Sequence, residues 1–344
     1  MFILDNGNRW VVPRTELTFP GHNRRMHEKA AEAEVDHVMA DLEDACPYDQ
    51  KGPSSRTAII NAFNEIDFNQ KVVTFRPNNI QSPFFLGDVE AIVKGAPNKF
   101  HGIILPKSNN PEDIIYLSKL LDNLEYESGW DYQIKIEALI ETPEALIRAY
   151  DIAKASSRMA GLIFGLADFA ASMGVVQVVE KQNVNFAYAK QSVAVAAKAA
   201  GLHAIDNVYF NLVRGDTPEE EAKRIETQLY EKNKEAANFG MDGTWVIHPS
   251  QATIANKAFT PEDEQVQYAM KVIDYFHHQG GGAFVMPDTD EFVDEATAKG
   301  YLVLLAKAAQ GDKVDEEWLK IQADRHKDVT GYDILSQAGK SLRS

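Results

Sequence analysis

The sequence has one cysteine, an excess of acidic over basic residues, and no long apolar run. Because Cys46 stands alone, an internal disulfide and a cysteine-rich metal site are excluded, and a cytoplasmic setting is expected. Basic residues number 35 against 51 acidic ones, and the net charge of −16 argues against general nucleic-acid binding. No stretch approaches the roughly 18 apolar residues of a membrane span. The first residues also lack the pattern of a signal peptide.

The 344 residues exceed one small domain and fit an α/β barrel of about 250 residues with an extension. Short apolar runs alternate with helical patterns, as in a parallel sheet that is buried on both faces. This alternation predicts a (β/α)8 barrel; an open doubly wound sheet is the competing fold, and it would normally carry a GxGxxG turn that is absent here. The expected strands are 16–19, 37–42, 72–75, 102–105, 134–140, 161–164, a weak one near 204–209, and 244–247.

Two domains are expected, with a boundary at Gly280. Residues 1–279 would form the barrel and end in a helix over 259–278, with Thr260 as its cap. Gly280, Gly281 and Gly282 would form a flexible break. Residues 280–344 would form a helical lid over 288–310 and a charged, loosely packed tail from 312.

Two carboxylates, Glu141 and Asp168, directly follow apolar strands. Catalytic groups of a barrel lie at the carboxyl ends of its strands, so these side chains would meet at one mouth. There they could share one hard cation such as Mg2+. The alternative is that Glu141 complements a helix dipole and Asp168 caps a helix.

Three further polar residues follow other strands. Arg76 could hold a carboxylate or an enolate oxygen, or it could form a structural ion pair with Glu43 or Asp44. Lys107 is equally open to a positioning or a structural role. His248 precedes a proline, and a histidine there is more often a turn residue than a base.

A basic cluster opens the first expected helix. Arg24, Arg25 and Lys29 follow Asn23, a candidate cap, and Arg14 precedes the first strand. Free N–H groups and cations at a helix N-terminus form a natural phosphate site. The alternative is a solvated surface, which is the commoner meaning of such a run.

Six ordered segments then give the sequence a resemblance to the citrate lyase β-subunit/malyl-CoA lyase group of the HpcH/HpaI aldolase family. The segments span most of residues 14–310, and residues 76–83 together with the length of the tail resemble the malyl-CoA lyase branch. The six segments are residues 19–23, 41–45, 105–107, 139–142, 164–171 and 247–251.

The resemblance implies a (β/α)8 barrel with a C-terminal helical lid, and Mg2+ (with Mn2+ as an alternative) held by Glu141 and Asp168. It implies reversible cleavage of malyl-CoA or β-methylmalyl-CoA to the 2-oxo acid glyoxylate and acetyl-CoA or propionyl-CoA. It also implies a homotrimer or homohexamer in which a lid aspartate, matched by Asp294, enters a neighbour's site. The segment before Asp294 departs from the family pattern, so Asp288 and Asp290 are alternatives.

The resemblance also indicates which residues hold substrate. With Arg76 and Asp294 as the catalytic pair, the residues expected to bind the acyl-CoA or the 2-oxo acid are Arg14, Arg24, Arg25, Lys29, Glu43, Asp44, Arg76, Lys107, Ala167, Ile247 and His248. Competing functions are a citrate lyase β-subunit, a citryl-CoA or citramalyl-CoA lyase, a malyl-CoA thioesterase, and a non-catalytic CoA-binding regulator.

Overall fold

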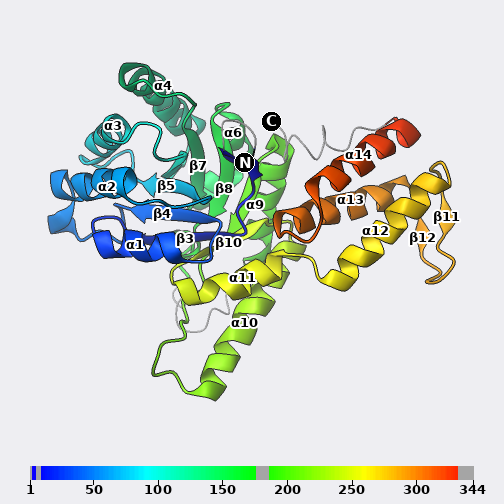
Figure 1. Cartoon of the computed structure of the whole chain (residues 1–344). Coiled ribbons are helices and arrows are strands. Elements are labelled where there is room, and N and C mark those ends of the chain that lie inside the picture. Colours follow the sequence, from blue (N-terminus) through cyan, green and yellow to red (C-terminus); the bar gives the residue numbers. More distant parts are fainter. Residues whose placement is uncertain (1, 5–8, 176–185, 332–344) are drawn as a thin grey trace. The chain divides into compact units, whose positions relative to one another are not determined.

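The computed structural model describes residues 2–4, 9–175 and 186–331. Within Met1–Phe259, eight parallel strands close into a barrel in the order β10-β3-β4-β5-β6-β7-β8-β9 (Figure 1). The predicted (β/α)8 barrel is therefore confirmed. Its strands are β3 (Thr15–Pro20), β4 (His37–Asp41), β5 (Val72–Arg76), β6 (Gly102–Leu105), β7 (Lys135–Ile140), β8 (Met159–Phe164), β9 (His203–Asp206) and β10 (Gly243–Val246).

Helices follow the strands and cover the outside of the barrel (Figure 1). Two caps form as the sequence predicts: the Asn23 side chain accepts from the N–H of Arg25, and the Thr142 side chain from the N–H of Ala145. A short antiparallel pair, β1 (Phe2–Leu4) and β2 (Arg9–Val11), precedes the barrel. The helices are α1 (Arg24–Glu32), α2 (Pro53–Glu65), α3 (Phe85–Gly95), α4 (Pro111–Ser128), α5 (Pro143–Ile147), α6 (Ala149–Lys154), α7 (Leu166–Ser172), α9 (Ala187–Ala200), α10 (Glu219–Asn238) and α11 (Ala252–Phe259), with 3-10 turns η2 (Tyr48–Gln50) and η3 (Pro249–Gln251).

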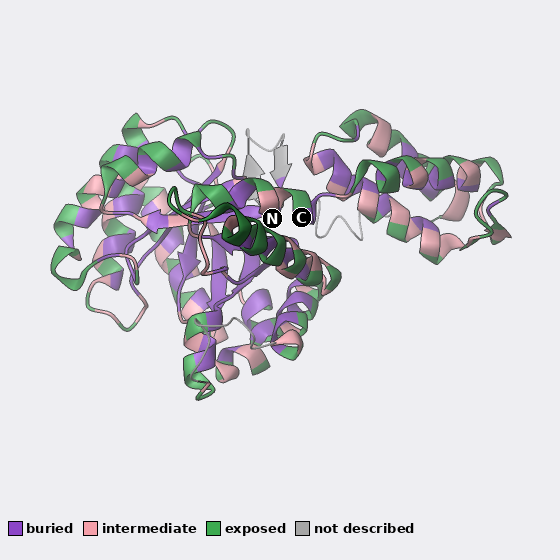
Figure 2. Cartoon of the chain, turned by 90° about the horizontal axis from the view of Figure 1, so that it is seen from below, coloured by how far each residue is buried: buried purple, intermediate pink, exposed green. Residues whose placement is uncertain are grey.

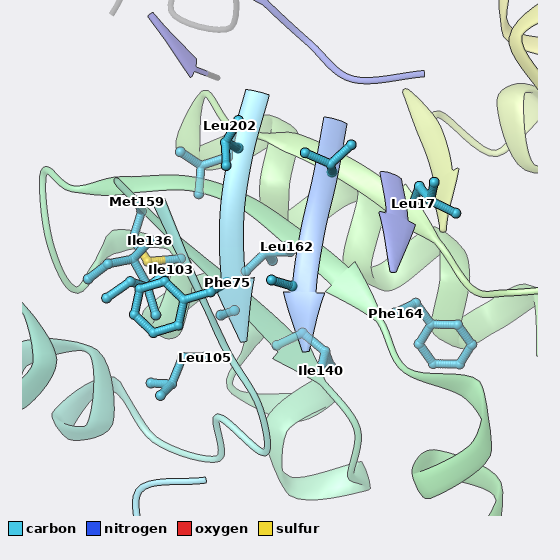
Figure 3. Packing of buried hydrophobic residues seen from close by; sticks show 14 of the residues in the cluster. Leu17, Phe75, Ile103, Leu105, Ile136, Ile140, Met159, Leu162, Phe164 and Leu202 are labelled. Carbon is cyan, nitrogen blue, oxygen red and sulfur yellow. The ribbon is translucent and has the colours of Figure 1, made fainter. Parts of the chain in front are cut away.

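Side chains alternate between the two faces of each strand and sort the barrel into an outer core and an inner stack. The outer core lies between strands and helices and includes Ile136, Ile140 and Phe164 (Figure 3). The strand residues of the outer core and those of the barrel interior are both buried, as the colouring of Figure 2 shows. A separate apolar cluster fills the middle of the barrel interior: Met39, Ile104, Leu139, Ile163, Ile205 and Trp245.

The same alternation places polar residues above and below this apolar middle layer. In β7, Leu139 belongs to the middle layer, so Glu141 lies toward the carboxyl end and Glu137 toward the amino end of the same face. Both glutamates are almost fully buried. The barrel interior thus holds two polar layers that are separated by an apolar one.

The second compact unit comprises Thr260–Ser344. Its helices α12 (Asp263–His278), α13 (Glu295–Gln310) and α14 (Glu316–Thr330) share one apolar core, beside the hairpin of β11 (Phe284–Val285) and β12 (Phe292–Val293). The helix α14 falls in the stretch that was expected to be loosely packed, and it buries Ala323 and His326. Residues 332–344 of that stretch lie outside the described residues.

The units divide earlier than the expected boundary at Gly280. The expected helix over 259–278 is α12 and begins only at Asp263, because the residue before Pro261 is disfavoured in helical conformation. Glu262, not Thr260, caps α12, and it does so in a capping box with Gln265. Gly280, Gly281 and Gly282 all have positive φ and lie inside the second unit, where they join α12 to β11. The expected lid helix over 288–310 begins only at Glu295.

No helix among the described residues is long and apolar enough to cross a membrane.

Candidate active site

Glu141 stands at the carboxyl end of β7 and is 2 % exposed. Its Oε2 accepts a 2.8 Å hydrogen bond from the backbone N–H of Lys107, which follows β6. Burial raises the pKa of Glu141 to about 7; Arg76 opposes this shift, and the negative charge of Asp168 adds to it. The structure therefore brings Glu141 and Asp168 close enough to interact.

Asp168 lies in the first turn of α7, which starts directly after β8. The connection is Gly165, and a Cβ at this position would lie 2.3 Å from Cγ of Glu141. Only glycine therefore lets the loop between β8 and α7 pass beside the Glu141 carboxylate. Gly165 thus leads directly from the side of Glu141 into α7, whose first turn carries Asp168.

These two carboxylates fit a hard divalent cation. Both offer oxygen ligands only, and Mg2+ is typically bound by one or two carboxylates together with water and substrate oxygens. A buried carboxylate beside a second carboxylate is unfavourable as an anion, and a cation between them would remove that penalty. We find no such fit for a cysteine-bound metal, because Cys46 is the single cysteine of the chain.

Arg76 ends β5 and is held in place by Asp41 at the end of β4. Its Nε and Nη2 donate to the two carboxylate oxygens of Asp41 at 2.7 and 2.6 Å. Asp41 in turn accepts 2.8 Å hydrogen bonds from the N–H groups of Glu43 and Ala45. Burial disfavours the ionised form of Asp41, but Arg76 and these N–H groups keep the pKa of Asp41 below its usual value. The guanidinium is thus fixed on one edge by a bidentate pair.

The other nitrogen of the Arg76 fork faces two more carboxylates. Nη1 lies 3.3 Å from Glu43 and 3.3 Å from Asp44, so the ion pairs weighed from the sequence are present. Lys107 Nζ also donates to Glu43, at 2.7 Å. Lys107 has φ 51°, a left-handed conformation that is uncommon outside glycine, and this conformation aims its N–H at Glu141.

Sequence reasoning missed two residues of this network, Asp41 and Trp245. Asp41 pairs in register with Arg76 in the β4–β5 ladder, and the Trp245 ring lies 5.3 Å from the Arg76 guanidinium carbon. Period-two alternation from Glu43 would have placed Asp41 on the interior face. No pattern marks Trp245, because it reads as one more apolar residue of a strand.

The remaining candidates in the barrel unit are spread around it. Arg24, Arg25 and Lys29 are exposed on α1, with Arg24 paired to Glu28 and Glu65. Arg14 precedes β3 and is bound by Asp36 at 2.8 Å, so it lies at the opposite end of the strand from α1. The expected joint cluster of Arg14 with the other three cations is therefore not formed.

The candidates after β8 and β10 are half-buried or exposed. Ala167 is exposed in the first turn of α7. His248 caps the turn η3, where its Nδ1 accepts from the N–H of Ser250 at 3.2 Å. Half-buried Ile247 donates its N–H to Gln251 at 3.0 Å. His248 thus has the turn role that the sequence favoured over a base.

The lid candidates belong to the second unit. Asp294 caps α13, and its Oδ1 accepts from both the N–H and the hydroxyl of Thr297 at 2.9 and 3.0 Å. Asp288 forms an ion pair with Lys271, and Asp290 has φ 54° in the loop of the hairpin. Of the three, Asp294 is half-buried.

Gly165→Ala is expected to disrupt the site without a change in any polar group. The new Cβ would collide with Cγ of Glu141 and displace its carboxylate. We expect a loss of about 10- to 100-fold in affinity for the divalent cation, the usual effect of disturbing groups that orient a ligand. Isothermal titration with Mg2+ measures it. Gly215→Ala is the matched control, since a Cβ there meets nothing within 4 Å; equal affinities for both variants would contradict this geometry.

Comparisons with known proteins show the family of the chain. A family model described as HpcH/HpaI aldolase/citrate lyase matches residues 14–249. The chain is 28% identical over 319 residues to L-malyl-CoA/beta-methylmalyl-CoA lyase of Rhodobacter capsulatus, covering 88% of this chain and 93% of that enzyme. It is 31% identical over 267 residues to citrate lyase subunit beta of Leuconostoc mesenteroides subsp. cremoris, covering 77% and 83%. Its structure matches the citrate lyase beta subunit of M. tuberculosis complexed with oxaloacetate and magnesium, with TM-score 0.58, 25% identity, and coverage of 72% and 97%. Because the family model spans more than half of the chain, the protein belongs to the HpcH/HpaI aldolase/citrate lyase family, a family of carbon–carbon lyases.

Proposed function

We propose that the chain catalyses the reversible carbon–carbon cleavage of malyl-CoA or β-methylmalyl-CoA to glyoxylate and acetyl-CoA or propionyl-CoA. The observation that carries the proposal is the Glu141–Asp168 carboxylate pair beside the fixed guanidinium of Arg76, at the catalytic end of the barrel. The match along 93% of a malyl-CoA/β-methylmalyl-CoA lyase supports this substrate class. The single cysteine, a free thiol, is compatible with the cytoplasm as the setting.

Glu141 and Asp168 would hold Mg2+, for which Mn2+ is an alternative. When bound, the ion would lower the pKa of the substrate hydroxyl and polarise the carbonyl that forms from it. The magnesium in the M. tuberculosis relative supports this assignment. Glu141 would be the more firmly held of the two ligands, because it is buried and is oriented by the N–H of Lys107.

Arg76 would stabilise the thioester enolate. Cleavage would release the hydroxyl proton to solvent, break the carbon–carbon bond and leave its electron pair on the thioester as an enolate, which then takes up one proton from solvent through the lid carboxylate. Asp41 occupies the Nε–Nη2 edge, so Nη1, which also pairs with Glu43 and Asp44, is the nitrogen that would donate to the enolate oxygen. Because the guanidinium is already fixed, little reorganisation is needed when the charge develops.

Asp294 would transfer the proton at the enolate carbon. In condensation the same carboxylate removes a proton from the methyl group of acetyl-CoA. Hydrogen bonds from Thr297 lower the pKa of Asp294, which keeps it in the ionised form that condensation needs. In the proposed homotrimer or homohexamer, this residue would act in a neighbouring subunit's site.

A panel of acyl-CoA substrates with Mg2+ tests the proposal. Malyl-CoA and β-methylmalyl-CoA should be cleaved to glyoxylate, with citramalyl-CoA and citryl-CoA slower. The 31% identity to a citrate lyase β-subunit makes citryl-CoA the second candidate substrate. Faster turnover of citryl-CoA would replace the proposed substrate, and release of free CoA with malate would indicate a thioesterase.

Arg25→Gln with Lys29→Gln is expected to raise KM for the acyl-CoA by roughly 3- to 10-fold, the effect of losing one or two exposed charge contacts. The value of kcat should change less, because contacts to remote phosphates exist equally in the ground and transition states. Steady-state kinetics at two salt concentrations measure both. Lys119→Gln is the control, because Lys119 is an exposed cation on α4. An unchanged KM would show that Arg25 and Lys29 are solvated surface residues without a role in binding.

The proposed sharing of the lid predicts complementation between two inactive variants. Asp294→Ala and Asp168→Ala subunits, once mixed and exchanged, should recover part of the wild-type activity. Some mixed sites would combine an intact carboxylate pair with an intact lid. Activity of the mixture, with subunit exchange followed by a fluorescent label, is the measurement. No recovery despite exchange would contradict the sharing of Asp294 between subunits.

A further inference from the structure

A second polar layer fills the amino-terminal end of the barrel interior. Glu16 of β3, His37 of β4, Thr74 of β5, Glu137 of β7 and His203 of β9 all point inward and are at most 1 % exposed. The apolar middle layer that contains Leu139 and Trp245 separates them from Glu141 and Asp168. The reaction proposed above uses none of these five side chains.

Three residues of this layer bring ligand-type atoms close together. One atom each from Glu16, Glu137 and His203 lie within 4.8 Å of one another. His203 Nε2 is 2.5 Å from Glu137 Oε1, and His37 Nδ1 is 3.1 Å from Glu16 Oε1 and 3.9 Å from Glu137 Oε2. The other ring nitrogen of His37 contacts the Thr74 hydroxyl at 2.7 Å, which fixes the ring with Nδ1 toward the carboxylates.

Two facing carboxylates need a proton or a cation between them. Both oxygens of Glu16 and Oε2 of Glu137 are buried, and the contacts of these carboxylates are with one another and with the imidazoles of His37 and His203. Burial raises the pKa of Glu16 to about 8 and the pKa of Glu137 well above its usual value.

We propose that Glu16, Glu137 and His203 bind one divalent transition-metal ion, of which Zn2+ is the type. Mixed imidazole and carboxylate ligands suit zinc, whereas the pair at the catalytic end offers oxygen only. The two carboxylates would balance the charge of the ion. The ion would tie together β3, β7 and β9.

The dimensions suit such an ion after small shifts. Bonds of about 2.0–2.2 Å in a tetrahedral site put ligand atoms roughly 3.3 Å apart. The short contact between His203 and Glu137 would open as the ion replaces the shared proton, and the wider separations would close. Gly161 faces the His203 ring, and a Cβ there would lie 2.2 Å from Nε2. Glycine at this position therefore makes room for the ligand ring.

Metal analysis of the purified full chain tests the proposal. Cells grown with added zinc supply the protein, dialysis against a chelator strips exposed sites, and elemental analysis counts the remaining metal. A buried site that fills during folding should keep about one zinc per chain. Asp168→Ala, which alters only the catalytic end, should keep it as well. The zinc content of Glu137→Gln and of Gly161→Ala should be at least tenfold below that of the wild type.

Refolding gives a second readout if a variant fails to fold in cells. Wild-type chain refolded with zinc should unfold at a higher temperature than the same chain refolded with chelator, and Glu137→Gln should show no such difference. A wild type that carries no metal after purification and gains no stability from zinc would overturn the proposal. The three residues would then share protons only.

Discussion

Asp168→Ala is expected to abolish metal-dependent turnover while the barrel stays folded. Glu141 alone would hold the cation weakly, because the Asp168 carboxylate beside it would be gone. A bound cation of this kind is worth several kcal/mol of transition-state stabilisation. At 1.36 kcal/mol for each factor of ten, kcat should fall by about 10³-fold or more.

Asp151→Ala is the matched control, since Asp151 also lies in the first turn of a helix, α6, but is exposed on the outside of the barrel. Turnover with saturating Mg2+ and with excess chelator, together with circular dichroism, separates loss of the site from loss of the fold. Full activity of Asp168→Ala in chelator would contradict the assignment of the carboxylate pair.

Arg76→Lys is expected to lower kcat by about 10²-fold or more, the scale for removing one preorganised donor to an oxyanion. Lysine keeps the positive charge but lacks the planar fork that binds both oxygens of Asp41 and still presents Nη1. Buried Asp41 would also lose one of its two hydrogen bonds to residue 76, so some loss of stability accompanies the change.

Arg56→Lys provides a matched control away from the catalytic end of the barrel. Arg56 also pairs with a buried aspartate, Asp88, at 2.7 Å, and it joins α2 to α3. It should therefore lose stability in the same way but keep its kcat. Activity of Arg76→Lys within twofold of wild type would show that Arg76 is a structural residue.

The strands of the barrel were predictable because each is a short apolar run between amphipathic segments. Seven of the eight were strongly marked, and the eighth, expected weakly over 204–209, is β9 at His203–Asp206. The start of the expected helix over 259–278 was placed too early, because Thr260 and Pro261 were taken as its cap and first turn. The capping box of Glu262 and Gln265 is the local signal that sets the start at Asp263.

The polar interior was only half predictable. Glu141 stood out because it follows an apolar strand. Glu137 lies within the same strand as one polar residue among apolar ones, so it was not singled out. Its partner His203 is distant in sequence, and only closure of the barrel brings the two together. Asp41 was missed for a related reason, since its partner Arg76 lies in the next strand.

The most direct test of the central claim is the product balance from malyl-CoA. Wild-type protein with Mg2+ should release acetyl-CoA and glyoxylate in equal amounts, and the reverse reaction should consume both. Chelator should stop both directions. Mass spectrometry of the thioesters and an assay of glyoxylate measure the two products in one sample. Acetyl-CoA without glyoxylate, malate with free CoA, or turnover that persists without a divalent metal would contradict the account.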